Sequence, residues 1–228
     1  MPKPTALLRA LVPLSVLAAV ATGAACQSPS ASQPPGKSIP SPVRTPVPPP
    51  HKKYTTPITR LLDNATYQTT RTRFYDPAYV RLAYPNGDVP IKRGVCTDVV
   101  IRALRAAGTD LQKNVHEDMR RNFRAYPAKW GLKRPDPNID HRRVPNLQTY
   151  FKRHGKALPV TDRVADYRPG DIVSWRLPNG LDHIGIVADG AVPGEVRHPV
   201  IHNIGRGAAE EDVLFAWKIT GHYRYFAR

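Results

Sequence analysis

The chain has 228 residues, and its 34 lysines and arginines against 18 aspartates and glutamates give a formal charge of +16. Its two cysteines exclude a disulfide-rich scaffold and a multi-cysteine zinc module. No apolar stretch after residue 25 approaches the roughly 20 residues that a transmembrane helix needs. The composition is typical of one basic globular domain that follows a proline-rich segment.

Residues 1–26 have the features of a signal peptide. Two basic residues precede the apolar run of residues 10–21, which is too short to cross a bilayer alone. Residues 23–26 (Gly-Ala-Ala-Cys) are similar to a lipobox, in which Cys26 would be lipidated and become the mature N-terminus. Ordinary secretory cleavage nearby is the alternative. The sequence therefore predicts an exported protein, anchored to a bacterial membrane through lipid on Cys26.

Residues 27–57 form a segment rich in proline and serine that contains ten of the 25 prolines and no acidic residue. Such a segment buries too little apolar surface to offset its chain entropy, so we expect a disordered tether. Fully extended, it would reach roughly 90 Å at about 3.1 Å per residue. The globular domain is then expected at residues 58–228.

Four helices are expected in the first part of this domain, at residues 59–68, at residues 96–107, from Asn114 onward, and at residues 145–154. The second has the clearest pattern, because its apolar residues recur at helical spacing from Cys96 and Gly108 is a favourable C-terminal stop. Asn114 is expected to cap the third helix, since Glu117 follows three residues later.

After Gly170 the pattern changes to short β-rich runs separated by glycine, proline and asparagine. These runs are residues 171–177, 183–189, 200–204, 213–218 and 221–226. They predict consecutive antiparallel strands. Helices followed by strands indicate an α+β domain.

Cys96 is the residue whose predicted position points most directly to chemistry. A helix N-terminus carries positive partial charge, which favours a thiolate and lowers the pKa of the thiol. His183 and His202, on predicted strands, could form a relay with it. His202 and Asn203 face opposite sides of their strand, so only one of them can orient His183. From spacing alone, a cysteine that opens an apolar helix is more often a packing residue than a nucleophile.

The ordered set of motifs resembles the NlpC-type cell-wall peptidases, a papain-like group. The resemblance is carried by Tyr84, Gly94-Val95-Cys96 and the segments 169–175, 182–187 and 200–202. Residues 94–104, 139–147, 169–187 and 221–225 resemble more closely the domain-of-unknown-function family 1287, which is similar to that group.

The resemblance implies a papain-like α+β domain in which N-terminal helices pack on a C-terminal antiparallel sheet. It makes Cys96 the nucleophile, His183 the general base and acid, and His202 the orienting residue, with Asn203 as the alternative. Tyr84 would contact the substrate.

Three further residues are candidate substrate contacts. The Asp-Cys-Ser-Gly that is usual around the nucleophile is replaced by Val-Cys-Thr-Asp, ending at Asp98. Arg142 and Arg143 belong to a polar cluster before the last predicted helix and could bind a substrate carboxylate through the guanidinium fork. A cap-forming loop is the alternative for this cluster.

The resemblance and the predicted export together imply a cysteine hydrolase, an amidase or peptidase, that cleaves an amide bond in peptidoglycan. A non-catalytic wall-binding lipoprotein and a thiol acyltransferase with the same residues stay open. The basic charge suits peptidoglycan or another anionic cell-envelope polymer, and export argues against nucleic acid. A monomer without cofactor is expected, and no short metal-binding spacing favours a metal site.

Overall fold

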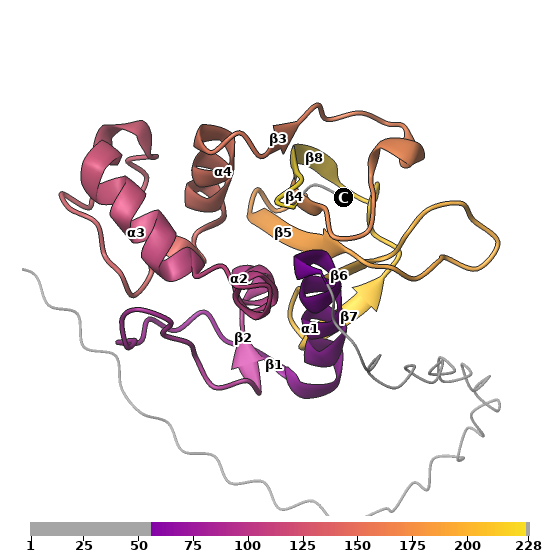
Figure 1. The fold of residues 1–228 in the computed structure, drawn as a ribbon, viewed down its shortest axis with the longest axis horizontal. Coiled ribbons are helices and arrows are strands. Elements are labelled where there is room, and N and C mark those ends of the chain that lie inside the picture. Colours follow the sequence, from indigo (N-terminus) through magenta and orange to yellow (C-terminus); the bar gives the residue numbers. More distant parts are fainter. Residues whose placement is uncertain (1–55, 227–228) are drawn as a thin grey trace, which may run out of the picture. The chain divides into compact units, whose positions relative to one another are not determined.

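The computed structural model describes residues 56–226, which form a mixed α+β fold with four α-helices and a six-stranded antiparallel sheet (Figure 1). The predicted signal peptide, Cys26 and nearly all of the predicted tether lie outside the described residues. Within residues 56–226, no helix combines the length and the hydrophobicity needed to cross a membrane.

The α-helices lie close to their predicted positions. They are α1 (Pro57–Arg71), α2 (Cys96–Ala106), α3 (Leu111–Asn122) and α4 (Val144–Arg153). Short 3-10 helices occur at η1 (Phe123–Ala125), η2 (Asp140–Arg142) and η3 (Val164–Asp166). The prediction that Asn114 begins a helix is wrong, because the Asp110 side chain accepts a hydrogen bond from the Lys113 amide and caps α3 one turn earlier.

The main sheet has the order β3-β8-β4-β5-β6-β7. Its strands are β3 (Ala157–Leu158), β4 (Ile172–Arg176), β5 (Asp182–Val187), β6 (Val200–Asn203), β7 (Ala208–Glu211) and β8 (Lys218–Tyr223). The strands are not all consecutive, because β8 lies between β3 and β4. A separate parallel pair joins β1 (Phe74–Tyr75) to β2 (Arg93–Gly94).

One predicted strand is wrong, and one observed strand was not expected. Residues 213–217 form a turn on the face of the sheet opposite the helices. There the Leu214 carbonyl accepts a hydrogen bond from the buried Trp175 indole at 2.9 Å. Residues 208–211 form β7, a strand that is not among the predicted β-rich runs.

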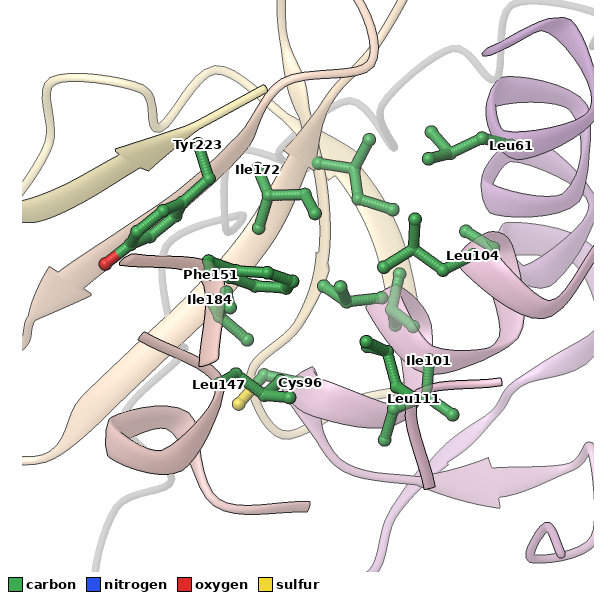
Figure 2. Packing of buried hydrophobic residues seen from close by; sticks show 14 of the residues in the cluster. Leu61, Cys96, Ile101, Leu104, Leu111, Leu147, Phe151, Ile172, Ile184 and Tyr223 are labelled. Atoms are coloured by element: carbon green, nitrogen blue, oxygen red, sulfur yellow. The ribbon is translucent and has the colours of Figure 1, made fainter. Parts of the chain in front are cut away.

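The two faces of the sheet carry different clusters of buried side chains. Because alternate residues of a strand point to opposite faces, Ile184 and Ile186 of β5 pack with the helices, whereas Val187 packs with Trp175 on the other face. Helix α2 packs against β5, with α1 on one side of it and α3 and α4 on the other (Figure 1). Figure 2 shows the helix-side cluster, which includes Cys96.

Candidate active site

Cys96 is the first residue of α2, as the sequence predicted, and it is 5% exposed. Its side chain packs in the helix-side cluster, and Figure 2 shows it beside Leu147 and Ile184. The chain that leads into the helix is held by Asn203, whose Nδ2 donates a hydrogen bond to the Gly94 carbonyl at 3.0 Å. Gly94 is required here, since a Cβ atom would lie 2.9 Å from Oδ2 of Asp98.

The sulfur lies near the Ile184 amide of β5, which precedes the residues of this strand that pair with β6. Ile186 and Val187 of β5 pair with β6, whereas the preceding residues of β5 do not. Burial raises the pKa of the Cys96 thiol to about 12, and hydrogen bonding from the backbone amides of Ile184, Thr97 and Cys96 itself opposes this. The expected lowering of the pKa is therefore wrong for this structure: burial outweighs the helix N-terminus.

Three side chains form a continuous polar contact on the other face of β5, here called the histidine row (His183, His202 and Glu211). Nε2 of His183 and Nδ1 of His202 are hydrogen-bonded at 2.9 Å. Nε2 of His202 lies 3.0 Å from Oε2 of Glu211 on β7, a close ion-pair contact and not a hydrogen bond. Of the two candidate orienting residues, His202 contacts His183, and Asn203 points to the other face.

The local sequence makes this contact possible. Gly185 follows His183 on the same face, and a Cβ atom there would lie 3.1 Å from Cβ of His202 and 3.0 Å from the Ile201 carbonyl oxygen. Trp217 packs edge-on against both imidazoles, with ring centroids 5.7 Å and 6.0 Å away. The glycine therefore gives His202 room, and the indole excludes water from one side.

Burial keeps both imidazoles neutral. It lowers the pKa of His183 to about 3, with the neighbouring His202 acting in the same direction. It also lowers the pKa of His202, an effect that Glu211 opposes. Because a carboxylate only accepts hydrogen bonds, Glu211 favours a proton on Nε2 of His202. His202 then accepts through Nδ1, and His183 donates through Nε2, so that Nδ1 of His183 is left unprotonated.

Cys96 packs in the helix-side cluster, whereas the His183 ring packs against Trp175 and Trp217 on the other face of β5. The Ile184 amide that acts on the sulfur belongs to the residue directly after His183. No hydrogen bond joins Cys96 to His183 within residues 56–226, and Nδ1 of His183 has no hydrogen-bond partner there. The link between the two residues is therefore the backbone of β5, through the Ile184 amide that directly follows His183.

Asp98 and Arg142 form a buried ion pair beside Cys96. Nε and Nη2 of Arg142 donate to the two Asp98 oxygens at 3.0 and 2.9 Å. Oδ2 of Asp98 also accepts a hydrogen bond from the Val95 amide at 2.7 Å. This hydrogen bond caps the start of α2. Arg142 further donates to the Ala78 carbonyl at 3.1 Å. Asp98 and Arg142 were predicted to contact the substrate. In the structure they hold the start of α2 in place, because their hydrogen bonds are made within the protein.

The other predicted substrate contacts lie farther from the thiol. Arg143 lies over the Trp130 ring in a separate pocket. Tyr84 packs edge-on against His116 of α3, with ring centroids 5.3 Å apart, and no described contact joins it to Cys96. The tyrosine near the sulfur is Tyr75, which pairs with Gly94 across β1 and β2. Burial raises the pKa of Tyr75 to about 12, and the Cys96 thiolate adds to this rise.

Sequence reasoning missed Tyr75 and Glu211. Tyr75 would have emerged only from pairing residues 74–75 with residues 93–94, which two-residue strands do not reveal. Glu211 alternates with Ala209 beside a predicted strand, which was a weak indication of β7. Among residues 56–226, no cluster of three or more histidine, cysteine or acidic side chains is arranged to hold a metal ion.

Comparison with known proteins places this site in a family. Residues 62–225 match the family described as "Domain of unknown function (DUF1287)". The chain belongs to the DUF1287 family. It is also similar to "Uncharacterized protein YijF" of Escherichia coli (strain K12), with 63% identity over 168 residues, which cover 74% of this chain and 82% of that protein. The matched DUF1287 region contains Cys96 and the whole histidine row.

Proposed function

We propose that this protein is an exported cysteine hydrolase that cleaves an amide bond in cell-wall peptidoglycan. The observation that carries the proposal is the histidine row, which ends in an unpaired imidazole nitrogen next to the residue whose amide acts on the Cys96 sulfur. A cysteine that opens a helix, a histidine on one strand and a polar residue on the next also support a papain-like fold of the NlpC type. Export, a lipid anchor on Cys26 and an anionic wall polymer as partner belong to the same proposal.

The chemistry follows from the proton positions. As the Cys96 sulfur attacks the amide carbonyl, its proton passes to Nδ1 of His183. The imidazolium is stabilised through His202 and Glu211 and then protonates the leaving amine, which leaves a thioester on Cys96. Water hydrolyses the thioester after giving a proton to His183, and the thiol is restored. The backbone amide of Cys96, at the helix N-terminus, is a suitable donor to the developing oxyanion.

A non-catalytic wall-binding protein is the second candidate. It is favoured by the burial of Cys96 and by a thiol pKa of about 12, which leaves hardly any thiolate at neutral pH. In this role the same surface would recognise the polymer without breaking a bond.

The test is digestion of purified peptidoglycan by the wild-type protein and by the Cys96→Ala and His183→Ala variants. Released fragments and new amino groups are identified by liquid chromatography with mass spectrometry. His154→Ala is the matched control, because its side chain is 42% exposed and outside the site. The proposal predicts the same products from the wild type and the control, and none from Cys96→Ala.

Two outcomes would change the conclusion. Products from Cys96→Ala would reject Cys96 as the nucleophile. No products from any form, with equal co-sedimentation of the wild type and Cys96→Ala with peptidoglycan, would favour the non-catalytic candidate.

A further inference from the structure

A pocket of about 270 Å³ lies between α3, η1, the loop at residues 126–132 and the start of α4. Its walls are mainly apolar and include Met119, Phe123 and Leu132. This volume is slightly below the ~300–1,000 Å³ of typical ligand pockets, so it suits a small group such as one amino-acid residue.

The pocket contains a buried acceptor that has no partner. Asn146 is 0% exposed, and its Nδ2 donates to the Asp140 carbonyl at 3.0 Å. Its Oδ1 has no hydrogen-bond partner within the described residues. Buried side-chain oxygens are normally paired in folded proteins, so this atom is suited to accept a hydrogen bond from a ligand N–H.

The pocket also contains the guanidinium of Arg143, which makes only some of the hydrogen bonds that it can donate. Arg143 lies over the Trp130 ring, 4.1 Å from its centroid, and Nη1 donates to Oδ1 of Asp140 at 3.3 Å. Its Nε and Nη2 make no hydrogen bond in the part of the chain that the structure describes. Asp140 contacts only Nη1 of the Arg143 guanidinium. The other carboxylate oxygen of Asp140 accepts a hydrogen bond from the Asp136 amide. The open edge fits the two oxygens of a carboxylate.

The pocket lies beside the candidate active site. Asn146 precedes Leu147, which packs against Cys96 in the helix-side cluster (Figure 2). Lys129, which lies between the lining residues Ala128 and Trp130, forms an ion pair at 3.3 Å with Asp182, the residue before His183. Two lining segments of the pocket are therefore connected, through Leu147 and through Asp182, to the residues around Cys96 and His183.

We propose that this pocket binds one residue of a peptide, with its apolar side chain among Met119, Phe123 and Leu132, its amide N–H on Asn146 and its free carboxylate on Arg143. Only one part of this rests on the proposed function, namely that the bound residue adjoins the cleaved amide. The binding itself requires no reaction at Cys96.

The test is calorimetric titration of the Cys96→Ala protein with N-acetyl-leucine and with N-acetyl-leucine amide, which lacks the carboxylate. We expect N-acetyl-leucine to bind, and the amide to bind at least about tenfold more weakly, as loss of a charged hydrogen bond predicts. Arg143→Gln should weaken N-acetyl-leucine binding by the same factor. Arg121→Gln is the control, since it removes the same charge from an exposed position of α3 outside the pocket.

Leu132→Glu provides a second variant. Leu132 is 38% exposed, so the fold tolerates the change, and the new carboxylate would repel the ligand. Absence of N-acetyl-leucine binding, equal binding of the two ligands, or full binding by Arg143→Gln or Leu132→Glu would overturn the pocket proposal. If Arg143→Gln does not fold, the binding of N-acetyl-leucine by Leu132→Glu decides whether the pocket proposal holds. Ligand binding together with intact peptidoglycan in the digestion experiment would overturn the hydrolase proposal alone.

Discussion

Two polar clusters, the Asp98–Arg142 pair and the histidine row, differ in whether their hydrogen bonds are complete. Asp98 and Arg142 use both carboxylate oxygens and the whole guanidinium edge within the protein. The histidine row has one hydrogen bond, between His183 and His202, and an ion-pair contact from His202 to Glu211, and no hydrogen bond to Nδ1 of His183 is found among the described residues. A completed cluster holds the helix start in place, whereas a supported imidazole with a free nitrogen can accept a proton. We therefore expect changes in the first cluster to affect mainly stability and changes in the second to affect mainly turnover.

The largest effect is expected from Arg142→Met, which leaves the Asp98 carboxylate buried without its partner. Removing one member of a buried ion pair costs about 3–5 kcal/mol of unfolding free energy. Urea denaturation measures the loss. The double variant Asp98→Asn/Arg142→Met should recover part of it, because no uncompensated charge remains. A loss below about 1 kcal/mol in the single variant would show that the pair is not part of the framework.

Stability should also fall between pH 7 and pH 5. The folded pKa values of His141 and His183 are about 3, below the unfolded value, because both rings are buried. The unfolded chain therefore binds more protons, and each ring costs about 2 kcal/mol over this range. Asp140, whose pKa burial raises to about 6, gains a proton in the folded state and offsets about 1 kcal/mol.

Urea denaturation at pH 7, 6 and 5 tests this dependence. His141→Asn should reduce the slope by the contribution of one ring. Equal stability at the three pH values would contradict the neutral, buried state of the two histidines.

Gly185→Ala should disturb the histidine row and the core packing of Val200 beside it. The added methyl group would lie 2.7 Å from Cγ1 of Val200 and would also press on Cβ of His202 and on the Ile201 carbonyl. Overpacking of this kind costs about 1–3 kcal/mol. We expect turnover on peptidoglycan to fall by more than the stability loss explains, because His202 moves away from His183. Unchanged turnover, measured well below the melting temperature, would show that His202 does not need this position.

The smallest change in stability is expected from Glu211→Gln. A side-chain amide can donate to or accept from His202, so the preference for a proton on Nε2 is lost. Turnover should fall by about tenfold, equivalent to about 1.4 kcal/mol, and the pH profile should change, while the unfolding free energy stays within about 1 kcal/mol. Glu210→Gln on the same strand is the matched control. Equal turnover and equal pH profiles for the two variants would show that Glu211 has no part in the function of the histidine row.

The sequence predicted those parts of the fold that local patterns determine. The stripe of apolar residues after Cys96 and the stop at Gly108 defined α2, and alternation placed His183 and His202 on strands. The start of α3 was missed because Asp110 and Asn114 are both good caps, and tertiary packing of the buried Leu111 favours the earlier one. Residues 213–217 are apolar because they cover Trp175, not because they pair.

The candidate site was predicted less completely than the fold. Cys96, His183 and His202 lie in neighbouring elements as expected. Asp98 and Arg142 were predicted to bind substrate, yet they bind each other, because two charges brought together by packing satisfy one another when buried. Tyr75 and Glu211 lie on short strands whose pairing depends on residues far away in the chain. Long-range pairing of this kind leaves no periodic pattern in one sequence.

The most direct test of the account is the protonation state of the two histidines in the substrate-free protein. Long-range ¹H–¹⁵N NMR correlations of the imidazole rings, assigned with His183→Gln and His202→Gln, distinguish the two neutral tautomers from the imidazolium. The account predicts that both rings are neutral at pH 7, carry their proton on Nε2, and leave Nδ1 of His183 free to take the proton of Cys96. A proton on Nδ1 of His183, or a charged His183 at pH 7, would contradict it.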